Sequence, residues 1–198
     1  MDNSLEVSAT GQGRSFWLGQ GLARQNFEEV SAAEVLIVPL KDFREGVAFA
    51  FHQDTASFAR YLAKNLAGQA KIEVLADDDE YVEIALHGAS LRFSTLVASA
   101  VIAPVLINLL SSYIYDELKA KPSDTVEMSL VIESHDCRSV HVGFKGDAKD
   151  FISAADKIRQ IARECMEPKG APGIQPLPSI GDSGTTGSGT EEPTDDQF

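Results

Sequence analysis

Cysteines, basic clusters and secretory signals are scarce or missing in this sequence. Its 198 residues hold two cysteines, Cys137 and Cys165, which are too few for a disulfide framework. Its 30 acidic side chains outnumber 17 basic ones, giving a formal charge of -13, and no run of Lys and Arg is present. Such a surface repels phosphate backbones and anionic lipid headgroups, so general nucleic-acid binding is not expected. The first residues lack a basic segment followed by an apolar one, which predicts a cytoplasmic protein.

Motifs for metal binding and catalysis are also missing. His135, Cys137 and His141 lie close together in the sequence, but zinc needs three or four converging ligands, and this segment is typical of a polar hairpin tip. His52 and Asp54 are typical of a strand end and a helix cap, with an acid–base pair as the alternative. We therefore expect no metal, no cofactor and no enzyme activity. The alternative is a catalytic site assembled from distant strands, because acids and bases can converge without a local motif.

The two ends of the chain differ from its middle. Residues 168–198 are rich in Pro, Gly, Ser and Thr, which predicts a disordered acidic tail. The final "EEPTDDQF", ending in Phe198, resembles the partner-recruiting tails of single-stranded DNA-binding proteins, and a purely solubilising tail is the alternative. Residues 1–33 predict an arm, an edge hairpin or a loop, in which Phe16 and Trp17 anchor the segment on this chain or on a neighbour.

Strand and helix patterns alternate through residues 34–167 and predict a single α+β domain. Apolar alternation or β-branched runs predict strands at 34–40, 46–51, 71–76, 81–87, 125–134 and 139–144. Helical spacing predicts helices between Asp54 and Gly68 and after Asp147. The polar segments "DDDE" and "HDCR" are expected to be exposed hairpin turns. We expect a mainly antiparallel sheet with helices on one face, in ferredoxin-like order, followed by an extra strand and a C-terminal helix.

The segment 94–115 has 22 uncharged residues and has two explanations. It is long enough to form a helix that spans a bilayer. However, Asn108 and Pro104 near its middle, and flanking strands that belong in one sheet, favour a helix buried in a soluble core. Four small residues have the spacing for close helix contact, which predicts that the helix also forms an oligomer interface. They are Ser94, Ala98, Ser99 and Ala103.

A resemblance in element order is carried by "AFAFHQDTASFARYLAKNLAG", "VASAVIAPVLINLL" and "VHVGFKGDAKDFISAADKI". Over residues 47–160, a strand, helix, hairpin, small-residue-rich apolar helix, hairpin and closing helix resemble the small effector-associated accessory modules of bacterial conflict and antiphage systems. The resemblance implies a non-catalytic role that joins a sensor or nucleotide-hydrolysing partner to an effector. We therefore expect a protein-binding adaptor that self-associates. A membrane-active effector that inserts residues 94–115 is the alternative.

Overall fold

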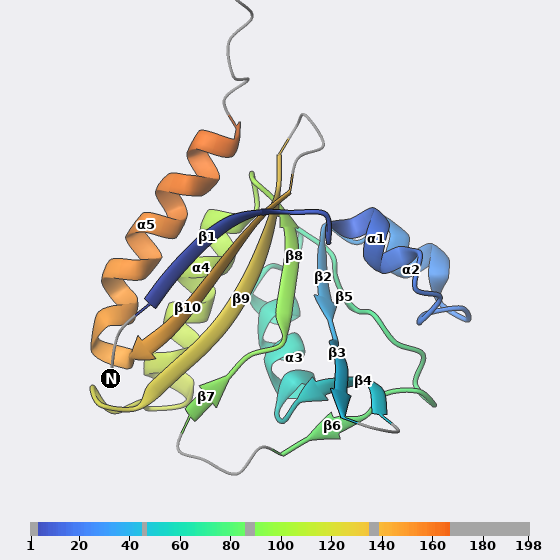
Figure 1. Cartoon of the computed structure of the whole chain (residues 1–198), viewed down its shortest axis with the longest axis horizontal. Helices are drawn as coiled ribbons and strands as arrows, with labels where there is room; N and C mark the ends of the chain where they lie inside the picture. Colours follow the sequence, from blue (N-terminus) through green and yellow to red (C-terminus); the bar gives the residue numbers. More distant parts are fainter. Residues whose placement is uncertain (1–3, 45–46, 86–89, 135–138, 167–198) are drawn as a thin grey trace, which may run out of the picture. The chain divides into compact units, whose positions relative to one another are not determined.

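The computed structural model describes residues 4–44, 47–85, 90–134 and 139–166, and its main feature is a mixed sheet with helices on both faces (Figure 1). The strand order is β1–β10–β9–β8–β2–β5, and β7 pairs in parallel with the start of β9. The bounds are β1 (Ser4–Thr10), β2 (Val35–Val38), β5 (Ile72–Val74), β7 (Ser90–Arg92), β8 (Thr95–Ser99), β9 (Thr125–Glu133) and β10 (Ser139–Asp147).

A smaller sheet lies beside the main one and has the order β3–β4–β6. Its strands are β3 (Leu40–Arg44), β4 (Val47–His52) and β6 (Glu83–Ile84). The helices are α1 (Arg14–Leu18), α2 (Phe27–Ala32), α3 (Thr55–Asn65), α4 (Ala103–Ser112) and α5 (Ala148–Met166), and the π-helix η1 (Tyr113–Glu117) continues α4.

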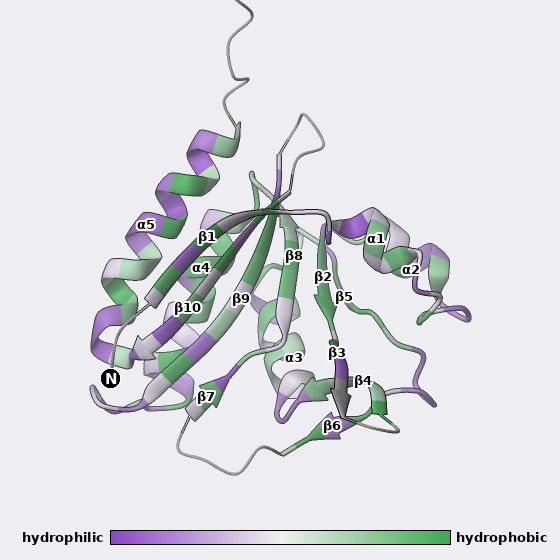
Figure 2. Cartoon of the chain, in the orientation of Figure 1, coloured by the Kyte–Doolittle hydropathy of each residue, from purple (hydrophilic) through white to green (hydrophobic). Residues whose placement is uncertain are grey.

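The main sheet separates two apolar cores. Helices α3, α4 and α5 cover one face, whereas the short helices α1 and α2 cover only part of the other. Alternate residues of β2 face each side, since Val35 and Ile37 belong to the first core and Leu36 and Val38 to the second. All four are buried, and Figure 2 shows β2 hydrophobic along its length. A strand buried on both faces needs no polar alternation, which explains the continuous apolar sequence.

The predicted α+β class is confirmed, including the hairpin of β9 and β10 and the C-terminal helix. The apolar stripe of α5 is also as expected. Phe151, Ala155, Ile158 and Ala162 are buried, and Cys165 is partly buried. Residues 4–33 contribute the edge strand β1 and helices α1 and α2 to the fold.

The hairpin predicted around residues 77–80 is wrong. β5 pairs in parallel with β2, Val35 lying opposite Ile72, and β6 pairs in parallel with β4. Because α3 returns the chain to its starting edge, the next strand runs in the same direction as β2. Asp77 is not solvated either: it is buried and accepts hydrogen bonds from the backbone amides of Arg24 and Gln25.

The single helix predicted over 94–115 is also wrong. The segment forms strand β8, a turn and helix α4, with Pro104 in the first turn of α4, where its missing N–H costs nothing. β8 lies between β9 and β2, so Leu96 and Ala98 face one core and Val97 the other. Within the described residues, no helix has both the length and the apolar composition needed to cross a membrane.

The four small residues therefore do not lie on one face of a helix. Ser94, Ala98 and Ala103 are buried within this chain, and Ser99, the last residue of β8, is partly exposed. In this structure the first three serve the interior packing of the protein.

Candidate functional site

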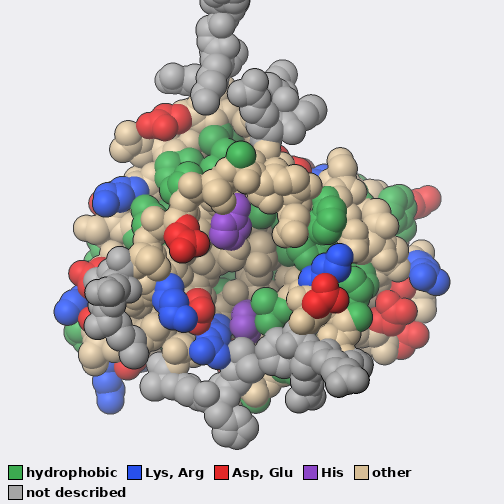
Figure 3. Space-filling view, viewed as in Figure 1, with side chains coloured by type: hydrophobic (Ala, Val, Ile, Leu, Met, Phe, Trp, Pro, Cys, Tyr) green, Lys and Arg blue, Asp and Glu red, His purple; other side chains and the backbone are tan. Residues whose placement is uncertain are grey.

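A hollow lined by both apolar and polar side chains lies on the main sheet face that α3, α4 and α5 leave uncovered. Its volume is about 500 Å³, and histidine, basic and acidic side chains gather at the centre of this face (Figure 3). It is lined by strands from both sheets, so no single stretch of sequence contains it. The polar side chains that line it come from β1, β4, β7, β8, β9 and β10 and are Ser4, Glu6, His52, Arg92, Thr95, Glu127, Ser129, His141 and Lys145.

One row across the sheet carries most of the charge in the hollow. Strand register places Ser4 opposite Lys145, Lys145 opposite Glu127, and Glu127 opposite Arg92. Glu127 accepts a hydrogen bond from Nε of Arg92 at 2.9 Å and one from Nζ of Lys145 at 3.2 Å. Although burial alone would raise the pKa of Glu127, these two cations lower it. The carboxylate is therefore ionised at neutral pH and holds both cations in place.

A second polar pair lies beside this row. The Oγ of Ser129 is 2.7 Å from Nε2 of His141, on the neighbouring strand. The imidazole lies over Gly143, where an added Cβ would come within 3.3 Å of the ring carbon Cε1. A side chain at position 143 would crowd the ring, so glycine allows it to lie flat along β10 toward Ser129.

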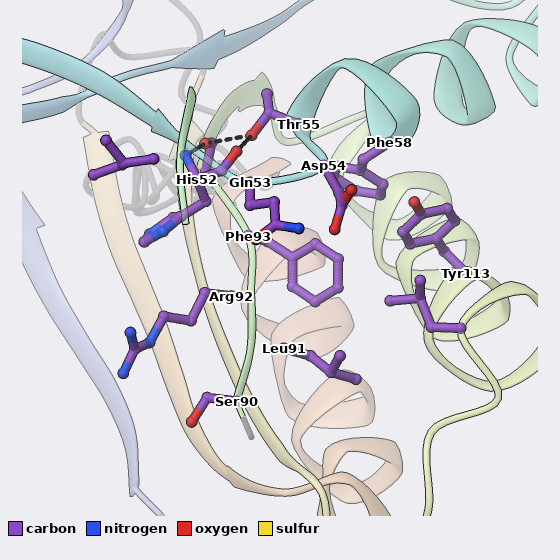
Figure 4. Close-up of a pocket in the computed structure, with 13 residues that line it drawn as sticks. His52, Gln53, Asp54, Thr55, Phe58, Ser90, Leu91, Arg92, Phe93 and Tyr113 are labelled. Atoms are coloured by element: carbon purple, nitrogen blue, oxygen red, sulfur yellow. Dashed lines mark hydrogen bonds between the residues drawn. The ribbon is translucent and has the colours of Figure 1, made fainter. Parts of the chain in front are cut away.

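Behind β7 there is a smaller cavity of about 160 Å³. Side chains alternate along this part of the chain, so Ser90 and Arg92 point to one side with His52, whereas Leu91 and Phe93 point to the other, toward Tyr113 (Figure 4). The pKa of His52 is lowered because burial and the neighbouring Arg92 disfavour the imidazolium form. His52 is therefore a neutral imidazole at neutral pH, at the boundary between the cavity and the hollow.

The buried hydroxyl groups of Ser94 and Thr55 hold together the wall between the cavity and the hollow. Ser94 Oγ accepts a hydrogen bond from the backbone N–H of His52 at 3.0 Å and lies 2.8 Å from the hydroxyl of Thr55. The Thr55 hydroxyl donates to the carbonyl of His52 at 2.6 Å. Ser94, predicted as a contact residue, therefore joins β4 to the segment between β7 and β8 and positions His52.

Helix α3, at the edge of the cavity, has an unexpected cap. Asp54, the predicted cap, has a left-handed backbone with φ of 67° and makes no capping hydrogen bond. Instead, Glu83 of β6 accepts from the backbone N–H of Ala56 at 2.9 Å and of Asp54 at 3.2 Å. Burial would raise the pKa of Glu83, but hydrogen bonds from Tyr81 and from these amides lower it.

We expect Glu83→Ala to destabilise the protein by about 1 kcal/mol at pH 7, because the first turn of α3 loses its acceptor. A lowered folded-state pKa stabilises the protein above the unfolded value of about 4.3, and this stabilisation is lost as pH falls. The difference between wild type and variant, measured by urea unfolding at several pH values, should therefore shrink below about pH 4.3. Exposed Glu80→Ala is the control, and a difference that stays constant with pH would contradict the capping role.

The other candidate surface is the free edge of β1. All seven residues of β1 pair with β10 in an unbroken antiparallel register, and the opposite edge of β1 is unpaired in the described structure. Most of its side chains are exposed, including Val7 at 50%. The other edge of the main sheet is β5, which has three residues and contacts α2 and α3. β1 is thus the long, accessible edge of the described sheet.

The structure places the remaining predicted site residues as follows. Trp17 is buried and Phe16 partly buried beside it, so both anchor α1 on this chain's own sheet. His141 lies in the hollow, whereas His135, Cys137 and Phe198 lie outside the described residues. The described residues contain no cluster of His, Cys, Asp and Glu that is suited to a metal ion.

Comparison of the chain with protein-family models, with curated proteins and with solved structures found no match. Functional inference for this protein therefore rests on the geometry of β1 and of the hollow.

Proposed function

We propose that this chain is a protein-interaction module that self-associates through the free edge of β1. The observation that carries the proposal is an unprotected edge strand. Natural proteins usually guard such edges with lysine, proline or a bulge, because unpaired N–H and C=O groups attract another strand. β1 has none of these, and its only charged residue is Glu6.

The sequence of β1 also suits pairing with a second copy of itself. An antiparallel pair with a two-fold axis at Val7 places Val7 opposite its counterpart, Glu6 opposite Ser8 and Leu5 opposite Ala9. No like charges face each other, and the exposed Val7 side chains bury one another. Such an interface joins the main sheets of two copies into one continuous sheet, in the way that strand addition joins other proteins.

An adaptor role follows from this arrangement. The resemblance to accessory modules of antiphage systems implies a non-catalytic protein that joins other components. A symmetric dimer presents two copies of every remaining surface, and bivalent binding of this kind strengthens weak contacts through effective concentration.

Sedimentation equilibrium tests the proposal. A single strand pair is small compared with a standard interface, so we expect a dissociation constant on the order of 10–100 μM. Over that concentration range the mass should rise from 21.3 kDa toward twice that value. Val7→Lys should hold the protein at 21.3 kDa, because two ammonium groups would face each other across the axis.

The matched control is Val101→Lys. Val101 is 67% exposed and lies outside β1, so this variant should associate like the wild type. Both variants should keep the wild-type circular dichroism spectrum. A wild-type mass of 21.3 kDa throughout this range, or equal association of the two variants, would overturn the proposal.

A further inference from the structure

We infer that the hollow on the sheet face opposite α3, α4 and α5 binds a small molecule through its phosphate group, held between Arg92, Lys145 and the Ser129–His141 pair. These residues line one hollow of about 500 Å³, which falls within the size range of small-molecule sites and leaves space for the organic part of a phosphate ester. The hollow is a different surface from the free edge of β1, and Glu6 is part of both.

Arg92 supplies the group best suited to this ligand. Its hydrogen bond to Glu127 uses Nε, and its guanidinium extends from β7 to the hollow side, away from Phe93 and Leu91 (Figure 4). The terminal amino groups of an arginine held in this way can donate two parallel hydrogen bonds to a phosphate. Because Glu127 already fixes the side chain, little rotational freedom remains to be lost on binding.

The Ser129–His141 pair provides a further donor in either tautomer. If Nε2 carries the proton, it donates to Ser129, whose own hydroxyl proton remains for a ligand. If Ser129 donates to Nε2, the Nδ1–H of His141 remains instead. One donor beyond the internal bond is thus present in either tautomer.

The charge balance of the hollow determines how strongly a phosphate can bind. Arg92 and Lys145 together carry two positive charges, and Glu127, which bonds to both, offsets one of them. Glu6 lines the hollow from β1 and adds one opposing charge, while the partly buried His52 is neutral. The charges of these four side chains therefore cancel, so a phosphate is held by the directed donors of Arg92, Lys145 and the Ser129–His141 pair, and Glu6 is the group that weakens its binding.

Nuclear magnetic resonance titration of the histidine ring protons tests the site, with inorganic phosphate, ribose 5-phosphate and ribose as probes at constant ionic strength. We expect saturable shifts for His52 and His141 with both phosphates, at dissociation constants of about 0.1–10 mM, and none with ribose. Arg92→Gln should weaken binding at least about tenfold, the effect of one lost charged hydrogen bond.

Two further variants make the outcome decisive. Glu6→Gln should tighten phosphate binding about threefold by removing a negative charge, a gain that damage to the fold would not produce. Arg163→Gln, in the last turn of α5, is the matched control and should bind like the wild type. Absence of a saturable shift in the wild type, or equal binding by the Arg92 and Arg163 variants, would overturn the inference.

Discussion

Alanine in place of Phe151 is expected to lower the free energy of unfolding by about 3–5 kcal/mol, because a large aromatic ring is removed from the core. Phe151 is fully buried on α5, and its ring meets the Phe144 ring of β10 edge-on at 5.3 Å between centroids. Removing it leaves a cavity between α5 and the hairpin of β9 and β10, which supports both β1 and the hollow. Urea unfolding followed by circular dichroism measures the loss.

Ile152 is the internal control for this experiment. It follows Phe151 in the sequence but is 57% exposed on the other side of α5, so Ile152→Ala should change stability by less than about 0.5 kcal/mol. Alanine is the best helix former, so neither substitution lowers helix propensity, and similar losses for the two would contradict the packing role of Phe151.

The second large effect is expected from Asp77→Ala, at about 3 kcal/mol, because two partly buried backbone hydrogen bonds lose their buried, charged acceptor. Oδ2 of Asp77 accepts from Arg24 N at 2.9 Å and Oδ1 from Gln25 N at 3.0 Å, while the carboxylate is buried with its residue only 4% exposed. These bonds hold the segment between α1 and α2 against the end of β5. Hydrogen exchange should therefore speed up first in residues 21–33, before the rest of the sheet.

Asp78 tests whether this effect belongs to one position or to the acidic run. It adjoins Asp77 but is exposed, so Asp78→Ala should leave both unfolding and exchange near wild-type values. Equal effects of the two substitutions would mean that local charge, and not the hydrogen bonds accepted by Asp77, stabilises this turn.

Sequence periodicity correctly predicted the elements that have one buried face and one polar face. α5 is buried on one side, and β9 and β10 alternate between core and polar residues, so periodicity was sufficient for each. The same reasoning failed for β8, because Leu96, Val97 and Ala98 are all buried and the sequence shows no alternation of apolar and polar residues. Pro104 was the available signal, since proline favours the first turn of a helix over its middle.

The hollow could be predicted only in part. Once Val126, Met128 and Leu130 are assigned to the core, Glu127 and Ser129 must face the other way, and the same argument applies to His141 and Lys145 on β10. The approach of Arg92 and His52 depends on β7 pairing with β9 and on β4 lying in a second sheet. Such long-range pairings follow from the crossovers through α3 and α4, which residue periodicity does not encode.

The pairing of β1 with β10 has a consequence for synthesis on the ribosome. Ser4 precedes its partner Lys145 by 141 positions, and β10 is the last strand of the described sheet to be made. At a translation rate of about 5–20 residues per second, β1 remains without its partner strand β10 for on the order of ten seconds. During this interval neither edge of β1 is paired with β10, so both can pair with β1 of a second nascent chain.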